Sequence, residues 1–480
     1  MLRIKTIQNK KIVKYDSITI VTYNPFTLLS QYRGVPMAIE LSSLVFTEQN
    51  DIVPVSGVEA INNTGTANTL GGNDLIFGTK ETKIDIPFQE TYSGIFNSGT
   101  LNTADGDDII TGGTISEIKS SGNYYGIYNI GSIYTGDGND SLLGDGNDGG
   151  FFNGFPNDIN NSPSIINTGN GDDLISAFAP RGDGLRNYSI INTGDGKDLI
   201  ETTGYYHGLL NEGSIDTGGD DDLILGTSRE GDFYEPAIYN SGSINTSDGN
   251  DRITGRGAYN AINPNGVINS GIINTGNGED SITSEGKFTN IGGVLLGDGN
   301  DSIAADTEFS NRALENFGFI GTGDGNDIIN STGIIYNQGV IETGNGDDSI
   351  IVNGGVEDNG TRYGIYNNGG AINMGDGNDS IIANEGFESD TNSSGAWFLG
   401  KGDDYIKGYG SGHFYGGNGN DTLELTPGTY TIGIWGQGGE SLIFTKGNQL
   451  MITSEFEKLK AGSTIYDFTS LTAGQIIVVA

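Results

Sequence analysis

The 480-residue chain contains no cysteine, which excludes disulfide bonds and thiolate metal sites. Proline is scarce, with 10 residues, and the only histidines are His207 and His413, so neither a proline-rich linker nor a zinc site fits the sequence. Basic residues are also few, because 23 Lys and Arg stand against 62 Asp and Glu, for a formal net charge of −39. Nucleic acids and anionic lipid surfaces attract clustered Lys and Arg, so neither is an expected partner, whereas a cation is.

Long apolar runs are missing as well. No run approaches the roughly 18 to 20 residues that span a bilayer, so membrane insertion is not expected. Residues 1–36 carry six basic residues and one acid, and their apolar stretch at 18–29 is interrupted by Thr, Tyr, Asn and Pro, unlike a secretory signal. We interpret 1–36 as a basic N-terminal segment whose presence in the mature chain is open, with Met37 as an alternative start.

Glycine, in contrast, is abundant, with 81 residues, and much of it falls in one repeated phrase. Fourteen times between Leu70 and Leu423 the chain writes a variant of Thr-Gly-Asp-Gly-Asn-Asp-Ser-Ile, for instance at Thr135–Leu142 and Thr322–Ile329. Glycine lets the backbone turn through positive φ, and the acids supply the hard oxygen ligands that calcium prefers. The phrase is most simply interpreted as a calcium loop.

The Asp that closes each loop recurs every 17 to 34 residues, which is typical of a solenoid whose insertions lie on one side. Short runs such as Ser132–Tyr134 alternate apolar and polar residues with strand period, and no helical period is sustained. The sequence therefore predicts an all-β fold, a right-handed parallel β-solenoid resembling a β-helix or β-roll, with Ile and Leu ladders in its core. A turn ladder of hydrogen-bonded amides is predicted for Asn97, Asn129, Asn211, Asn240, Asn337 and Asn367.

The predicted organisation has three parts after the basic segment. Residues 37–60 lead into the chain of repeats, which occupies 61–425, and residues 426–480 form a small C-terminal β cap over the open solenoid end. Strands of the cap are predicted at Thr429–Trp435, Ser441–Phe444, Leu450–Thr453 and Gln475–Val479.

The third and fifth positions of the six-residue loop vary together. Where the third is Asp the fifth is usually Asn, as in Asp137 and Asn139; where the third is Asn the fifth is acidic, as in Asn170 and Asp172. We interpret this as keeping the loop charge near −2, which one divalent cation would cancel. Stacked loops would repel one another without cations, so metal binding and folding are expected to be one process.

Other functional motifs are weaker. The EF-hand glycine and glutamate positions are not met, and His207 and His413 are interpreted as surface or turn residues. Arg181-Gly182-Asp183 spells an integrin tripeptide that chance explains in a chain so rich in Gly and Asp. No nucleophile with a matching base stands out, so catalytic activity is not expected, and a β-helical polysaccharide-active enzyme is the remote alternative.

At Gly416–Leu423 the sequence resembles the RTX, or haemolysin-type, calcium-binding repeat without a mismatch, and the other loops resemble it less closely. The resemblance implies a parallel β-roll in which several Ca²⁺ ions lie between successive coils, bound by loop carbonyls and the motif's Asp. Carried over, it nominates as metal ligands the closing residues Asp108, Asp140, Asp173, Asp198, Asp280, Asp301, Asp327, Asp348, Asp379, Asp404 and Asp421, with the glycines two and four places before them: Gly136, Gly138, Gly169, Gly171, Gly194, Gly196, Gly276, Gly278, Gly297, Gly299, Gly323, Gly325, Gly344, Gly346, Gly375, Gly377, Gly400, Gly402, Gly417 and Gly419.

This chain also departs from the family pattern. The nine-residue family period is mostly absent, so each coil is expected to carry one calcium loop. Three irregular loops are expected to bind weakly or not at all: Leu70–Asp74, which lacks a residue, the loop with Ser247 in place of a glycine, and the loop with Asp220 in place of its second glycine. The resemblance further implies an extracellular or cell-surface protein exported unfolded by type I secretion machinery, with Phe468–Ala480 compatible with the C-terminal signal.

A second hypothesis places the function in the insertions. The chain would then be an adhesin or surface-layer protein, and a cell-surface or matrix polysaccharide would be a candidate partner. The insertions Gly149–Pro163 and Ser228–Pro236 carry aromatic residues that could contact such a partner, namely Phe151, Phe152, Phe155, Phe233 and Tyr234.

Overall fold

The computed structural model describes residues 3–7, 10–15, 18–23, 38–54, 59–80, 82–86, 89–114, 122–155, 163–229, 235–258, 264–307, 312–356, 362–389, 395–436 and 441–480. The chain divides into two compact units, Met1–Asp248 and Gly249–Ala480, which are described separately. Within the described residues the only helical elements are the 3₁₀ turns η1 (Leu41–Ser43) and η2 (Phe468–Ser470); everything else regular is β-strand.

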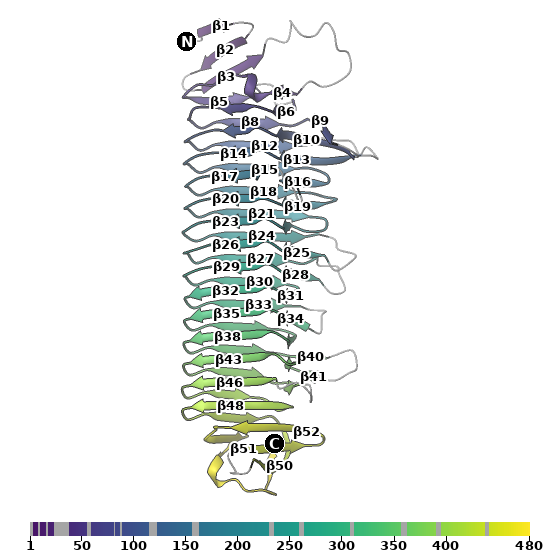
Figure 1. Cartoon of the computed structure of the whole chain (residues 1–480), viewed down its shortest axis with the longest axis vertical. Coiled ribbons are helices and arrows are strands. Elements are labelled where there is room, and N and C mark those ends of the chain that lie inside the picture. The colour runs from purple at the N-terminus through teal and green to yellow at the C-terminus, as the bar shows by residue number, and fades with distance from the viewer. Residues whose placement is uncertain are drawn as a thin grey trace. The chain divides into compact units, whose positions relative to one another are not determined.

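Both units are built from coils of up to three short strands, one on each of three faces named A, B and C (Figure 1). A representative coil runs through β13 (Asn123–Asn129) on face B, β14 (Ser132–Tyr134) on face C, an acidic loop, and β15 (Ser141–Asp145) on face A. Each strand pairs in parallel with the strand of the same face in the next coil, so Ile133 of β14 faces Ile166. The predicted parallel β-solenoid is confirmed.

The first unit contains seven strands on face C and seven that continue face A after its N-terminal strands. Face A holds β5 (Asn50–Val53), β8 (Leu75–Gly78), β12 (Ile109–Gly113), β15, β18 (Leu174–Phe178), β21 (Leu199–Gly204) and β24 (Leu223–Ser228). Face B holds β4 (Ile39–Glu40), β6 (Ile61–Asn63), β10 (Gln89–Asn97), β13, β16 (Gly149–Asn153), β19 (Asp183–Asn187), β22 (Leu209–Asn211) and β25 (Pro236–Asn240), with β9 (Thr82–Ile86) antiparallel to β10. Face C holds β7 (Thr66–Asn68), β11 (Thr100–Asn102), β14, β17 (Ile165–Asn167), β20 (Ile190–Asn192), β23 (Ser214–Asp216) and β26 (Ser243–Asn245).

The second unit repeats this arrangement. Face A holds β27 (Arg252–Arg256), β30 (Ser281–Glu285), β33 (Ser302–Asp306), β36 (Ile328–Ser331), β39 (Ser349–Val352), β44 (Ser380–Ala383), β47 (Tyr405–Lys407) and β49 (Thr422–Leu425). Face B holds β28 (Asn265–Asn269), β31 (Lys287–Asn290), β34 (Arg312–Asn316), β37 (Ile334–Asn337), β42 (Ile365–Asn367) and β45 (Phe387–Glu388). Face C holds β29 (Ile272–Asn274), β32 (Gly293–Asp298), β35 (Phe319–Asp324), β38 (Val340–Asn345), β43 (Ala371–Asp376), β46 (Ala396–Lys401) and β48 (Gly412–Asn418), and β40 (Gly355–Val356) forms a hairpin with β41 (Arg362–Tyr363).

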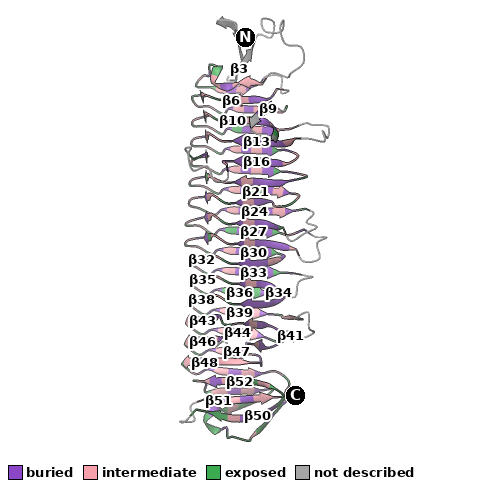
Figure 2. Cartoon of the chain, turned by 45° about the vertical axis from the view of Figure 1, so that its right-hand side comes forward, coloured by how far each residue is buried: buried purple, intermediate pink, exposed green. Residues whose placement is uncertain are grey.

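The core consists of aliphatic ladders, mostly one inward residue per strand, as predicted. In one coil Ile127, Ile133 and Leu142 contribute from faces B, C and A, and each is fully buried. Figure 2 shows buried residues running along the stacked strands. Aromatic residues replace the aliphatic ones near the C-terminal coils, where Trp397 and Phe414 stack with ring centroids 4.3 Å apart. Because parallel coils place equivalent residues in register, one apolar position per strand suffices to build a continuous core.

Buried asparagines line the turn between faces B and C, and the predicted amide ladder is confirmed. The side-chain amide of Asn97 donates to Oδ1 of Asn129 at 2.7 Å, and that of Asn129 donates to Asn153 at 2.8 Å. Six members of this ladder were not predicted: Asn63, Asn153, Asn187, Asn269, Asn290 and Asn316. The residues before these six asparagines differ from the Gly-Ile-Phe and Gly-Ile-Tyr sequences that precede Asn97 and Asn129.

Length differences between coils collect beside face B, which confirms that insertions are confined to one side. The acidic loop from face C to face A has six residues in every coil, from Thr69–Asp74 in the first unit to Gly416–Asp421 in the second, although strands such as β48 extend into its first three residues. The variable segments lie instead before or after a face-B strand, for example between β12 and β13 or between β16 and β17. The six-residue loops therefore keep a constant length, and equivalent loop positions lie next to each other in successive coils.

The C-terminal cap in the second unit is confirmed, including its four predicted strands. β50 (Gly428–Trp435), β51 (Ser441–Lys446) and β52 (Gln449–Ser454) form an antiparallel sheet, which β55 (Ile476–Val479) extends along β50. β52 pairs in parallel with β48 and so continues face C. Two strands were not predicted: β53 (Lys458–Ala461), which continues face A beside β49, and β54 (Thr464–Asp467), which is antiparallel to it.

The N-terminal end of the first unit is also closed by antiparallel strands. β1 (Arg3–Ile7), β2 (Lys10–Tyr15) and β3 (Ile18–Tyr23) form a meander, and β3 pairs in parallel with β5 of face A. The described residues of the basic segment therefore have β structure.

Candidate metal centre

The six-residue acidic loop joins face C to face A, and its shape depends on glycine. In the ten regular loops for which both glycines were nominated, the glycine at position two has φ between 89 and 111° and the glycine at position four has φ between 138 and 158°. A Cβ atom on Gly169 would lie 1.7 Å from the carbonyl oxygen of Gly136 in the preceding coil. The nominated glycines therefore serve two purposes, because they adopt positive φ and admit the backbone of the neighbouring coil.

Successive loops are joined by backbone hydrogen bonds at fixed positions. Thr135 N–H donates to Asn167 at 3.0 Å and Gly138 N–H donates to Asn170 at 2.8 Å, both in the next coil. The Thr135 hydroxyl also donates forward, to the carbonyl of Thr168 at 3.0 Å, and the same threonine ladder recurs in both units. This hydroxyl ladder was not predicted, although Thr at position one is visible in most of the loops.

The Asp that closes each loop is almost fully buried and points one carboxylate oxygen at the neighbouring coil. Oδ1 of Asp140 accepts the backbone N–H of Asp108 at 2.7 Å, and Asp140 N–H donates in turn to Oδ1 of Asp173. The first unit repeats this contact from Asp51 to Asp222, and the second repeats it from Asp251 to Asp421, where Asp421 N–H donates to Glu457.

The second carboxylate oxygen, Oδ2, is left unsatisfied. Within the described residues it is buried and accepts no hydrogen bond in twelve loops, those closed by Asp74, Asp108, Asp140, Asp173, Asp198, Asp280, Asp301, Asp327, Asp348, Asp379, Asp404 and Asp421. Where position one is threonine, as at Thr135 and Thr168, the hydroxyl donates to a carbonyl of the next coil. Buried acceptors without a donor are rare in native proteins, and a row of them calls for a bound group.

Glycine carbonyls lie in the same loops and are also unused. In the first unit, none of the hydrogen bonds between described residues ends on the carbonyl oxygen of Gly136, Gly138, Gly169 or Gly171. The loops closed by Asp140 and Asp173 thus each offer one carboxylate oxygen and two backbone carbonyl oxygens with no protein donor. Ca²⁺ prefers oxygen ligands of these two kinds, so the residues present fit the ion that the sequence predicts.

No cluster of three or more His, Cys, Asp or Glu side chains that could hold a metal is found in the part of the chain that the structure describes. The loops place one inward carboxylate per coil, so a site here would draw most of its ligands from backbone carbonyls. Such a donor set fits Ca²⁺ better than Zn²⁺, which takes Cys, His and carboxylate side chains.

Burial raises the pKa of the closing carboxyls well above the ordinary value of 3.8. For Asp108 burial is the dominant cause; the Thr103 hydroxyl and the Asp74 N–H oppose it, neighbouring carboxylates add to it, and the pKa is about 8. The pKa is about 7 for Asp74, Asp173, Asp301, Asp379 and Asp421, and about 6 for Asp140, Asp198, Asp348 and Asp404. Without a cation, these loops hold a charge that the fold disfavours.

The side chains at positions three and five of the loops are not part of the row of buried aspartates and lie on the solvent-exposed side of the loop. The amide of Asn170 donates to Asp137 at 2.9 Å, and the amide of Asn378 donates to Asp347 at 2.9 Å, each across neighbouring coils. The alternation of acid and amide therefore has a local cause, because an amide beside an acid replaces charge repulsion with a hydrogen bond. The interpretation that the alternation keeps the loop charge near −2 stays a prediction.

The irregular loops keep the same backbone course. The loop ending at Asp74 is complete, because Thr69 occupies position one and Leu70 takes the place of the glycine with φ of 75°; the prediction of a missing residue was wrong. Asp220 and Ser247 do replace glycines, with φ of 78° and 65°, and Ala104 is a fourth replacement that we did not predict. Positive φ is unusual for such residues, so these loops carry backbone strain.

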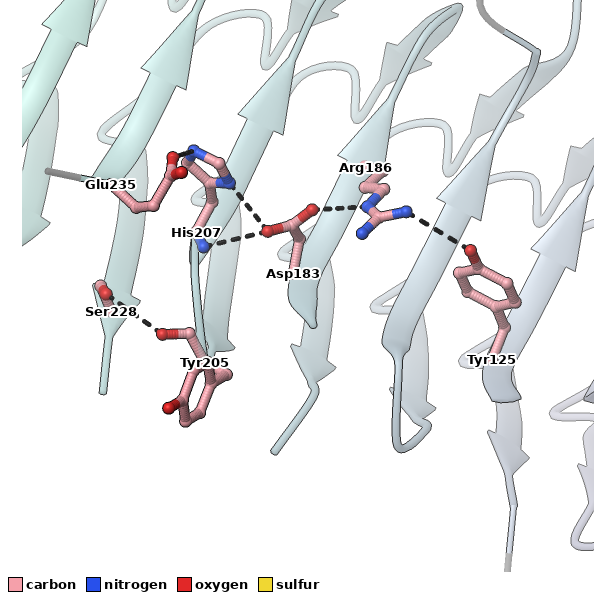
Figure 3. Close-up of polar contacts among 7 residues, drawn as sticks. All are labelled: Tyr125, Asp183, Arg186, Tyr205, His207, Ser228 and Glu235. Atoms are coloured by element: carbon pink, nitrogen blue, oxygen red, sulfur yellow. Dashed lines mark hydrogen bonds and ion pairs between the residues drawn. The ribbon is translucent and has the colours of Figure 1, made fainter. Parts of the chain in front are cut away.

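A second polar cluster lies on the B side of the first unit, where Asp183 and Arg186 of β19 meet His207 (Figure 3). The two ring nitrogens of His207 lie 2.8 Å from Asp183 and 2.9 Å from Glu235, and Arg186 pairs with Asp183. Burial alone would raise the pKa of Asp183, but the hydrogen bond from His207 and the charge of Arg186 outweigh it and hold it at about 2. Asp183, Arg186, His207 and Glu235 contact one another, so the cluster links neighbouring coils.

The positions of the two histidines and of the tripeptide 181–183 can be compared with their predicted roles. His207 lies in the loop between β21 and β22, but its side chain is 14% exposed and contacts Asp183 and Glu235, so it is not a surface residue. His413 lies in strand β48, stacked on Tyr415 with centroids 4.1 Å apart. Asp183 is buried, which leaves the tripeptide 181–183 without its exposed acid and agrees with its chance origin.

The aromatic residues assigned to a partner surface have other roles. Phe151 and Phe152 belong to β16 and are 0% and 6% exposed, so they pack within the solenoid and are not available to a partner. Phe155 packs partly buried against the cluster of Tyr125, Tyr128 and Phe152 on the outside of face B. Phe233 and Tyr234 lie outside the described residues.

No protein-family model matches the chain, and no curated protein is significantly similar to it. Among solved structures it is similar to a protein described as a hyperactive, Ca²⁺-dependent, β-helical antifreeze protein from an Antarctic bacterium. The identity is 17%, the TM-score is 0.39, and the match covers 90% of this chain and 94% of that one. These values are too low to support a functional conclusion. None of the described residues forms a helix long and apolar enough to cross a membrane.

Proposed function

We propose that the chain is a calcium-stabilised repeat protein whose acidic loops hold Ca²⁺ ions between successive coils of each unit. The observation that carries the proposal is the row of twelve buried Oδ2 atoms without a hydrogen-bond donor. The closing Asp would supply that oxygen, and the glycines at positions two and four would supply carbonyl oxygens. The bound ion would bring positive charge to carboxylates that are otherwise buried without a partner.

Binding and stability are coupled in this proposal. Oδ1 of each closing Asp already joins two coils through a backbone N–H, so an ion on Oδ2 would strengthen a contact that the fold uses. An ion that binds the folded but not the unfolded chain stabilises the fold in proportion to its concentration and affinity. The protein would then be structural, without catalytic activity of its own.

Equilibrium dialysis of the full chain against calcium tests the proposal. We expect roughly ten Ca²⁺ bound per chain at saturation, in the affinity range of extracellular calcium modules, and little displacement by equimolar Mg²⁺, which dehydrates reluctantly and demands octahedral sites. Binding of fewer than two ions, or equal binding of Mg²⁺, would contradict it.

We further propose that the protein acts outside the cell or at its surface and is exported through type I secretion machinery. What supports this is the demand for calcium, which extracellular fluids supply at the concentrations that weak repeat sites need. Residues 421–480 fused to a passenger in a host with that machinery should direct it to the medium. Retention of the fusion in the cell, while a fusion to a known signal is exported, would sink this part of the proposal alone.

The adhesin or surface-layer hypothesis remains an alternative. Residues 156–162 and 230–234 of the two insertions lie outside the described residues, and the aromatics that can be placed from Gly149–Pro163 pack against the solenoid. A cell-surface polysaccharide as partner therefore stays a prediction.

A further inference from the structure

The cap of the second unit ends in an apolar edge strand. β55 pairs with β50 through Thr431 and Ile476, and no other strand among the described residues pairs with it. Its inward residues Ile477 and Val479 are buried, whereas Ile476 and Val478 are 62% and 68% exposed. Native proteins normally protect such an edge with a charge, a proline or a bulge, because its free backbone groups attract another strand. β55 has none of these.

An uncharged surface continues from this edge across the cap sheet. The strand registers place Ile476, Thr431, Thr445 and Leu450 in one row across β55, β50, β51 and β52. Leu450 is 49% exposed, and Ile443 and Ile452 form part of the next row. Exposed apolar side chains on an unprotected edge strand, here Ile476 and Val478, indicate an interaction surface.

The distribution of charge indicates what covers this surface. Residues 426–480 contain three lysines and four acids, so they contribute −1 to the net charge of −39, and the preceding 425 residues contribute the remainder. Two copies of the chain would repel each other along their acidic loops. Outside the basic segment 1–36, the cap is the part of the chain at which a second copy can approach without that repulsion.

We propose that the cap joins two copies of the chain, with the β55 strands pairing antiparallel across a twofold axis. An antiparallel strand is complementary to itself, so the same backbone groups and the same outward Ile476 and Val478 serve both copies. The pairing continues the four-stranded cap sheet into the partner and removes both exposed edges. The contact is independent of the calcium loops.

Sedimentation of the full chain in calcium, over about 1 to 100 µM protein, tests the proposal. We expect a dimer that dissociates on dilution, and we expect Val478→Lys to weaken it by more than tenfold, because the substitution puts two lysines into the joint. Ile272→Lys is the matched control: Ile272 is 53% exposed on strand β29 and should leave the dimer intact. A monomer at every concentration, or equal loss in both variants, would overturn the proposal.

A second measurement keeps the test independent of protein stability. The chain has no cysteine, so Val478→Cys introduces its only thiol. A short bis-maleimide reagent should join Val478→Cys chains into dimers and leave Ile272→Cys chains mostly monomeric. Equal cross-linking of the two variants would contradict pairing at the cap.

Discussion

Asp348→Asn should remove calcium from its loop and lower the thermal unfolding midpoint in saturating calcium by about 4 to 12 °C. Asp348 is 1% exposed, its Oδ1 accepts the N–H of Asp327, and its Oδ2 has no donor. Asparagine keeps the Oδ1 contact and replaces the free oxygen with an NH₂ group. A lost charged contact of this kind costs about 2 to 3 kcal/mol, and each kcal/mol moves the midpoint of a unit this size by about 2 to 4 °C.

Asp347→Asn is the control, because the two aspartates are adjacent but face opposite ways. Asp347 is exposed and its Oδ1 accepts from Asn378, a role that asparagine can fill. We expect its calcium stoichiometry and midpoint to stay within about 1 °C of the parent, as for most surface changes. Equal effects of the two substitutions would contradict the assignment of Oδ2 as the ligand.

The sign of the Asp348→Asn effect should reverse without calcium. In chelator at pH 8, with enough osmolyte to keep the chain folded, the variant should be more stable than the parent. The parent then buries an ionised carboxylate that lacks a donor, and the variant buries a neutral amide whose NH₂ can donate. A variant less stable than the parent in both conditions would contradict the account.

Calcium should stabilise the protein little at pH 5 and strongly at pH 8. Ten of the closing carboxyls have pKa values of about 6 to 8 in the fold against about 4 in the unfolded chain. A raised pKa means that stability is fully present below about pH 4 and is lost as the pH rises through 6 to 8. One pKa unit is worth about 1.4 kcal/mol, so even a few such groups would offset much of a net stability of about 5 to 15 kcal/mol.

Calcium restores this loss only when the carboxyls have released their protons. Thermal unfolding with and without calcium should therefore diverge between pH 5 and pH 8, and titration calorimetry in two buffers should detect proton release near pH 6.5 that disappears near pH 9. A calcium effect independent of pH over this range, without proton release, would contradict a ligand role for the buried carboxyls.

Much of the fold was predictable because it repeats. One inward Ile or Leu per strand, an asparagine at one turn and a fixed six-residue loop can each be recognised from copies along the chain. The closing aspartates were predictable for the same reason, and the structure buries all eleven that were nominated. The structure adds the roles of the two carboxylate oxygens: Oδ1 accepts a backbone N–H from the preceding coil, and Oδ2 has no donor.

The sequence-based predictions failed at positions where the chain departs from its repeat pattern. Leu70 was taken as the start of its loop because nothing in sequence indicates that leucine can adopt a glycine conformation there. Phe151 and Phe152 were assigned to an insertion because the sequence of their strand, Gly-Gly-Phe-Phe-Asn, lacks the Gly-Ile-aromatic-Asn pattern of other face-B strands. The contacts of Asp183, His207 and Glu235 join three successive coils at positions that do not recur, so only the assembled coils bring them together.

Circular dichroism of the full chain at pH 8, recorded after chelation and during a calcium titration, tests the central claim most directly. We expect the calcium-free chain to lose most of its β-sheet signal and its cooperative thermal transition, millimolar Ca²⁺ to restore both, and Mg²⁺ to fail at the same concentration. The same β-sheet signal and the same unfolding midpoint in excess chelator and in calcium would contradict a calcium-stabilised solenoid.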